Sequence, residues 1–112
     1  MEEMTLIDVS MKIILHAGDA RLKIEDALKE AKAFNFAKAS ELLASAHEYI
    51  TLAHKEQTEI IQGEAQGQKH DLSILFIHAQ DTLMTIMSEL NLSKEIVASL
   101  QVLDERLRKA GI

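Results

Sequence analysis

Residues 72–90 read LSILFIHAQDTLMTIMSEL, and their apolar side chains recur at the three- and four-residue spacing of an α-helix. At about 100° per residue, one face of this helix collects Leu72, Phe76, Ala79, Leu83, Ile86 and Leu90. A second and nearly opposite face collects Ile74, Ile77, Met84 and Ser88, with Asp81 in its middle. A helix that is apolar on two faces is buried on two sides. We therefore expect the first face to pack in the core and the second to mediate self-association, with this helix on the symmetry axis.

The rest of the chain is also rich in helix formers. Proline is absent, glycine occurs four times in 112 residues, and Ala, Leu, Glu, Lys and Gln are abundant. Two interruptions, at residues 33–36 and 63–71, divide the chain into three helical segments. The expected helices are residues 5–32, residues 36–64 and a long third helix that starts near Leu72. Because the connections are short, we predict an all-α fold, an antiparallel up-down three-helix bundle.

The first two helices each carry one predicted core stripe. In the first helix the stripe is Met4, Ile7, Met11, Leu15, Gly18 and Leu22. In the second helix it is close to a heptad, with small residues that allow a neighbouring helix to approach: Phe36, Ala39, Leu43, Ala46, Ile50, Ala53, Gln57 and Ile60. Asn35 and Asp71 are the expected N-caps of the second and third helices.

The pattern of the third helix changes between Asn91 and Ser93. Beyond this point a new stripe, rotated by roughly 100° from the first, consists of Ile96, Leu100, Leu103 and Leu107. The sequence leaves two alternatives, a kink in one long helix or a separate fourth helix from Ser93 to Lys109. In both, the basic last turn and the following Gly111 mark a helix C-terminus.

Composition limits the possible functions. A chain of 112 residues and 12.5 kDa is expected to form a single domain, residues 1–112. Its net charge of −6 argues against a nucleic-acid partner, and the absence of cysteine excludes disulfides and thiolate chemistry and fits a cytoplasmic location. Residues 1–4 do not resemble a signal peptide, and no apolar run of about 18 residues occurs, so no direct membrane insertion is expected.

Most of the five histidines have an ordinary explanation at a surface or an interface. The pair His70 and Asp71 resembles a metal-binding motif of phosphohydrolases, but it lies in a loop and lacks further ligands. His47 and His54 lie seven residues apart on one side of the second helix, where the edge of the core stripe explains them equally well.

His78 and Asp81 form a more informative combination. They are three residues apart, about 60° around the helix. An imidazole titrates near neutral pH and is therefore a usable nucleophile. Asp81 lies on an otherwise apolar face, where an unpaired carboxylate is costly if it is buried. If three copies met on this face, three Asp81 carboxylates would converge and would need a cation such as magnesium or calcium. Gln80 points about 160° away from His78, so it could reach only the His78 of a neighbouring subunit.

The segment from His78 to Met84, HAQDTLM, resembles the active-site signature of the lactose/cellobiose family of IIA components in the bacterial sugar phosphotransferase system. Three further segments are similar to that family: AGDAR at 17–21, FAKA at 36–39, and AH at 53–54 followed by QT at 57–58. The order and spacing of these motifs agree with the family over most of the chain. Two features depart from it: Thr82 occupies a position where the family more often has His, and the chain beyond Met84 is several residues longer than usual.

This resemblance implies a homotrimer in which His78 accepts a phosphoryl group from the carrier HPr and passes it to a cysteine of a cognate IIB. It also implies a magnesium ion on the three-fold axis, held by three Asp81 residues, and connection through IIB to a membrane IIC. Gln80 would support the reaction, and Leu75, Ile77 and Thr82 would contact the protein partners.

The sugar is open, because in this system the membrane component recognises it, and β-glucosides and disaccharides both remain possible. The competing hypothesis is a non-catalytic trimeric adaptor or regulatory homologue, in which His78 and Asp81 only set the register of the helices.

Overall fold

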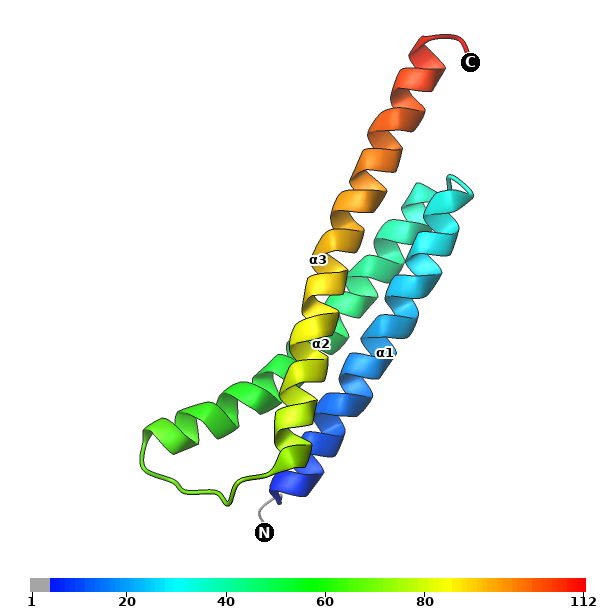
Figure 1. The fold of residues 1–112 in the computed structure, drawn as a ribbon. Helices are drawn as coiled ribbons and strands as arrows, with labels where there is room; N and C mark the ends of the chain where they lie inside the picture. Colours follow the sequence, from blue (N-terminus) through cyan, green and yellow to red (C-terminus); the bar gives the residue numbers. More distant parts are fainter. Residues whose placement is uncertain (1–4) are drawn as a thin grey trace.

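The computed structural model describes residues 5–112 as three helices, α1 (Leu6–Lys32), α2 (Phe36–Ala65) and α3 (Ile74–Lys109), with no strand among them. The helices run antiparallel in chain order, so α1 and α3 point the same way (Figure 1). The molecule measures 63 × 22 × 22 Å, and α1 packs against both other helices. The predicted all-α, three-helix architecture is confirmed. None of these helices is long and apolar enough to cross a bilayer.

Side-chain caps set where α1 and α3 begin. The Thr5 hydroxyl oxygen accepts the backbone N–H of Asp8 at 3.1 Å, and the Asp8 carboxylate accepts in return from Thr5, which forms a capping box. At α3 the cap is Ser73, whose Oγ accepts the N–H of Phe76 at 3.1 Å. The prediction that Asp71 caps this helix is wrong, because the Ser73 hydroxyl takes that role. Leu72 is consequently 88% exposed, outside the helix and the core.

The cap of α2 differs from the expected one in its side-chain bond. Asn35 is the N-cap residue as predicted, but its side chain makes no capping hydrogen bond. Its Nδ2 instead donates to Oε2 of Glu30 at 2.9 Å, which ties the turn back to the last turns of α1.

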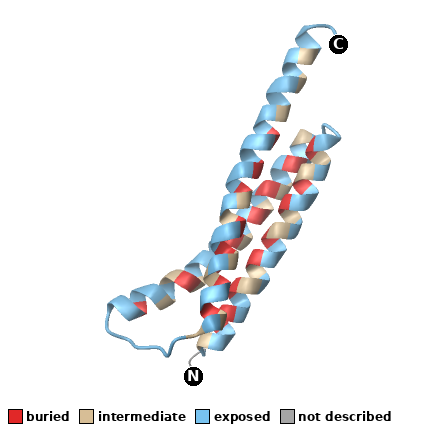
Figure 2. Ribbon diagram, in the orientation of Figure 1, coloured by how far each residue is buried: buried red, intermediate tan, exposed pale blue. Residues whose placement is uncertain are grey.

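The core stripes predicted for α2 and α3 are confirmed apart from Leu72. Buried residues face one another along the inner sides of the helices (Figure 2). On α2 they are Ala39, Leu43, Ala46, Ile50, Ala53, Gln57 and Gly63, and on α3 they begin with Phe76, Ala79, Leu83, Ile86 and Leu90.

The stripe predicted for α1 is wrong. Ile7, Leu15 and Leu22 are about 60% exposed, Met11 is 45% exposed, and Met4 lies outside the described residues. The buried line of α1 consists instead of Val9, Ser10, Ile13, Ala17, Ala20, Ile24, Ala27 and Ala31. Alanines are favoured there because α1 lies against two helices at once, and short side chains let their backbones approach.

The third helix continues without interruption through residues 91–93, so a separate helix starting at Ser93 is wrong. Ser93 and Val97 are 4% and 3% exposed, and they extend the core line of Leu90 at the same three- and four-residue spacing. Of the predicted second stripe, Ile96 and Leu103 are each about half exposed, whereas Leu100 is half-buried against the core. The apparent change of pattern arose because a serine occupies a core position.

Two helices deviate from a regular three-helix bundle, one at each end of the molecule. The last turns of α2 bend away from α3, and residues 66–73 cross the gap to the start of α3 (Figure 1). At the other end, α3 extends past the turn that joins α1 and α2 (Figure 1). Beyond Val97 no residue is fully buried, although Leu100 still packs against the core (Figure 2).

An ion pair between Arg21 and Glu89 links α1 to α3. The guanidinium of Arg21 donates to both carboxylate oxygens of Glu89, at 3.0 and 3.1 Å, and this hydrogen bonding raises the pKa of Arg21 above its ordinary value. Both side chains are more than 40% exposed, so solvent screens the pair.

We expect Glu89→Gln to lower the free energy of unfolding by about 0.5–1 kcal/mol. The reason is that the amide keeps one hydrogen bond but loses the charge. Urea denaturation measures the change. Glu95→Gln is the matched control, since this exposed residue of α3 pairs with no described residue. Equal effects of the two substitutions would contradict a specific role for the Arg21–Glu89 pair.

Candidate functional site

His78 lies one turn after the start of α3, on an exposed face. Neither ring nitrogen forms a hydrogen bond or an ion pair with residues 5–112. The backbone carbonyl of His78 accepts the Thr82 hydroxyl at 2.8 Å, a bond that leaves the ring unaffected. The imidazole is therefore accessible to another molecule, which is the first requirement for a nucleophile in transfer between proteins.

The surroundings of His78 are mostly apolar. Leu75 is half-buried one turn before it, and Ile77 is 44% exposed next to it. Thr82 is half-buried one turn after it, and its hydroxyl is already used by the His78 carbonyl. Thr82 therefore offers mainly its methyl group to a docked molecule. The three residues predicted to contact partners thus lie around the histidine on one part of the surface.

Asp81 is exposed and forms no hydrogen bond or ion pair within the part of the chain that the structure describes. Ile77 and Met84 lie one turn on either side of it, 44% and 54% exposed, and Ile74 is 82% exposed. A subunit alone thus presents a line of large apolar side chains around one carboxylate. Residues 5–112 contain no group of three metal-ligating side chains, so this carboxylate is not part of a metal site within one chain.

Gln80 faces away from His78, toward α2, as the helical angle predicts. Its Oε1 accepts the Nε2 of Gln57 at 3.1 Å, and Gln57 is only 7% exposed. The sequence pattern places Gln57 in the core stripe of α2 and does not predict this contact. The available signal was a glutamine at a core position on a helix that otherwise buries apolar side chains.

A cleft of about 310 Å³ opens between the bent end of α2, the connecting loop and the first turns of α3. Gln80, Phe76 and Ile77 contribute from α3, and Ile61 and Glu64 from α2. The loop residues His70 and Asp71 also line this cleft, but no third ligand joins them among the described residues.

Two other histidines lie away from this cleft. His47 lines a groove of about 620 Å³ between α2 and α3, together with Lys94 and Val97. His54 lies 3.3 Å from the Thr58 hydroxyl, measured from its Nδ1.

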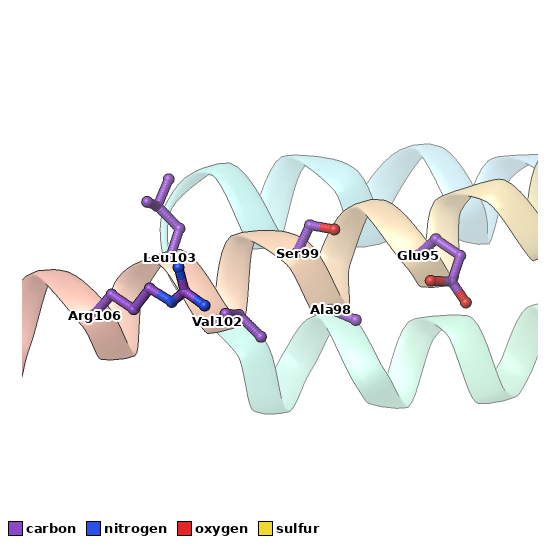
Figure 3. A pocket seen from close by; sticks show the side chains of 6 residues that line it. All are labelled: Glu95, Ala98, Ser99, Val102, Leu103 and Arg106. Carbon is purple, nitrogen blue, oxygen red and sulfur yellow. The ribbon is translucent and has the colours of Figure 1, made fainter.

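A further groove of about 480 Å³ runs along α3 between Glu95 and Arg106, in a part of the helix that begins beside α1 and α2 (Figure 3). It is lined by Glu95, Ala98, Ser99, Val102, Leu103 and Arg106. Its nearest residue follows His78 by 17 positions, or about 26 Å along a helix. No histidine lines it, so it is separate from the candidate site.

The family described as "PTS system, Lactose/Cellobiose specific IIA subunit" matches residues 8–101, which include His78, Gln80 and Asp81. The chain belongs to this family. The matched range ends inside α3, so the end of the projecting part lies beyond it.

Individual IIA proteins agree with this assignment. The lactose-specific EIIA component of Streptococcus mutans is 42% identical over 96 residues, which cover 86% of this chain and 90% of the relative. The crystal structure of the cellobiose-specific enzyme IIA from Bacillus anthracis superposes with a TM-score of 0.84 at 38% identity, over 92% of this chain and 95% of that one. The chitobiose IIA of Escherichia coli, solved in complex with HPr, gives 0.79 at 33% identity, over 91% and 99%.

Proposed function

We propose that this IIA protein is a cytoplasmic phosphoryl carrier. In this proposal His78 accepts a phosphoryl group from phospho-HPr and passes it to a cysteine of a cognate IIB, which serves a membrane IIC during uptake of a β-glucoside or disaccharide. The observation that carries it is the exposed and unpaired His78 ring, within the range that matches the family. The chitobiose IIA of Escherichia coli in complex with HPr supports HPr as the donor.

The proposed chemistry needs little from the protein beyond position. The lone pair of the neutral imidazole, at Nε2, attacks phosphorus while the bond from phosphorus to the HPr nitrogen breaks. In the second transfer the IIB thiolate attacks phosphorus and the bond to His78 breaks, which restores the free imidazole. Phosphoryl transfer depends mainly on alignment and charge stabilisation. The apolar collar of Leu75, Ile77 and the Thr82 methyl would dock each partner and exclude water, which slows hydrolysis of the phosphohistidine.

We further propose that the active form is a homotrimer built on α3. Ile74, Ile77 and Met84 are too exposed to contribute to the core of one subunit, and covering them in an assembly removes their apolar area from water. Sedimentation is expected to give about three times 12.5 kDa.

Asp81 fits a magnesium ion in this assembly. It is an unpaired carboxylate in the centre of the same apolar face, and oxygen ligands are those that magnesium prefers. Three Asp81 side chains on the axis would hold the ion, whose charge would offset their mutual repulsion. Within residues 5–112 Asp81 contributes no catalytic contact to His78, so we assign the ion a structural role.

Gln80 is proposed to act on the His78 of a neighbouring subunit. It lies on the α2 side of α3 and lines the cleft next to the apolar face. An amide N–H there could donate to a phosphoryl oxygen bound to the neighbour's histidine.

Phosphorylation in a reconstituted system tests the function. The protein is incubated with enzyme I, HPr and phosphoenolpyruvate, and acid-labile, base-stable phosphate on the chain is measured. Transfer to a IIB cysteine then completes the relay. Absence of label while HPr itself is labelled would contradict the carrier function and favour the adaptor or regulatory homologue.

The sugar is a property of the membrane partner in this proposal. The relatives carry lactose, cellobiose and chitobiose in their names, yet all are similar to this chain at 33–42% identity. We therefore expect a given sugar to be selected without contact to the IIA chain.

A further inference from the structure

We infer that Gln57 is a positioning residue for phosphoryl transfer, because its hydrogen bond across the helices holds the side chain of Gln80 at the cleft. The inference rests on the proposed function of Gln80. Gln57 belongs to the core line of α2, between the buried Ala53 and the half-buried Ile60. It is 7% exposed, whereas the other members of that line are apolar.

The burial of Gln57 is not explained by stability of the core. An amide gains less from burial than an aliphatic side chain of the same size, and it must keep a hydrogen bond to avoid a penalty. The other buried polar residue with a resolved bond, Ser10, bonds within its own helix, to the carbonyl of Leu6 at 2.7 Å. Gln57 instead bonds across helices to Gln80, a residue that lines the cleft.

The direction of this hydrogen bond has a chemical consequence. Gln57 Nε2 donates and Gln80 Oε1 accepts, so the carbonyl end of the Gln80 amide is held toward α2. The NH₂ end of Gln80 remains free of hydrogen bonds within the described residues. Gln80 is half-buried and lines the cleft, so its side chain is held at the border between α2 and the open surface of α3.

A phosphoryl group in transfer carries negative charge on its oxygens and is stabilised by donors, whereas a carbonyl oxygen would repel it. A glutamine side chain without such a bond moves between rotamers and is away from the cleft for part of the time. By holding the Gln80 side chain in place, Gln57 keeps its amide donors within reach before the phosphoryl group arrives. This is preorganisation of a donor by a residue that does not itself touch the reacting atoms.

Gln57→Leu tests the inference, because leucine fills the same core position without a donor. We expect the saturated rate of transfer from phospho-HPr to fall by about tenfold, in the range found when a donor to a transition state is disturbed. The KM for phospho-HPr is expected to stay unchanged, since the collar around His78 is intact. Thermal melting is expected to be equal or higher, because an aliphatic side chain replaces a buried amide.

A double-substitution cycle separates positioning from a structural role. In a Gln80→Leu background, Gln57→Leu is expected to cause no further loss of rate, since the amide that it orients is gone. Gln62→Leu is the matched control, an exposed glutamine on the same helix that does not line the cleft, and it should label like the parent.

The possible outcomes separate this inference from the proposed function. An unchanged rate for Gln57→Leu would overturn the inference, and so would an equal loss of rate with and without Gln80. If the parent protein and the Gln62→Leu control take up no phosphate, the proposed function itself fails. If both of them label, only the Gln57 result decides the inference.

Discussion

His78→Ala is expected to remain folded and to take up no phosphate. The ring forms no hydrogen bond with residues 5–112 and lies on an exposed face, so its removal should change the free energy of unfolding by no more than about 0.5 kcal/mol. Labelling should nevertheless fall to background, since no other histidine lies within the apolar collar of Leu75, Ile77 and Thr82. Circular dichroism and a phosphate-labelling time course with enzyme I, HPr and phosphoenolpyruvate measure the two effects.

His47→Ala and His54→Ala are the matched controls for this experiment. Both residues are exposed on α2, away from the apolar collar, and both variants should label at the parent rate. Retained labelling of His78→Ala, together with loss of label in either control, would move the acceptor to α2 and contradict the assignment.

Asp81→Leu is expected to make the trimer insensitive to a chelator. In the parent protein, removal of the divalent cation leaves three carboxylates that repel one another. In a partly desolvated site this repulsion destabilises the trimer by roughly several kcal/mol. The parent trimer should therefore dissociate or melt earlier in chelator and recover when magnesium is added. Leucine removes the repulsion and extends the line of Ile77 and Met84, so the variant should be stable without metal.

Thermal melts and sedimentation of both proteins, with and without chelator, measure this difference. Because we assign the ion a structural role, Asp81→Leu should still accept phosphate. Equal sensitivity of the two proteins to chelator would show that Asp81 is not the ligand. A monomer at micromolar concentration in magnesium would refute the assembly itself.

The spacing of apolar residues predicted the core face correctly in those helices whose buried positions carry large side chains. On α2 and α3 several core positions carry large apolar residues, such as Ile50, Leu83 and Ile86, so their spacing indicated the core faces correctly. On α1 the same reasoning selected Ile7 and Leu15, which lie outside. The reason is that a helix packed against two neighbours favours alanine at its contacts, and periodicity weighted by size does not register alanine.

The sequence identifies the residues of the candidate site. It identifies only some of the contacts that these residues make. His78, Gln80 and Asp81 follow from a local motif, and their directions follow from the helical angle. The hydrogen bond from Gln57 depends on how α2 and α3 are aligned along their length, which no local pattern specifies. For the same reason Ser93 looked like a break in the helix, although it occupies a buried core position.

Because α3 is one uninterrupted helix, the end of the chain is connected to the site through continuous helix. Lys109 follows Asp81 by 28 residues, about 42 Å at 1.5 Å per residue. Because the intervening helix has no break, a tilt of its first turns of only a few degrees is carried to the tip as a displacement of several ångströms. A reporter group at Gly111 would thus register reorientation of α3 during assembly from a distance, without occupying the surface where partners dock.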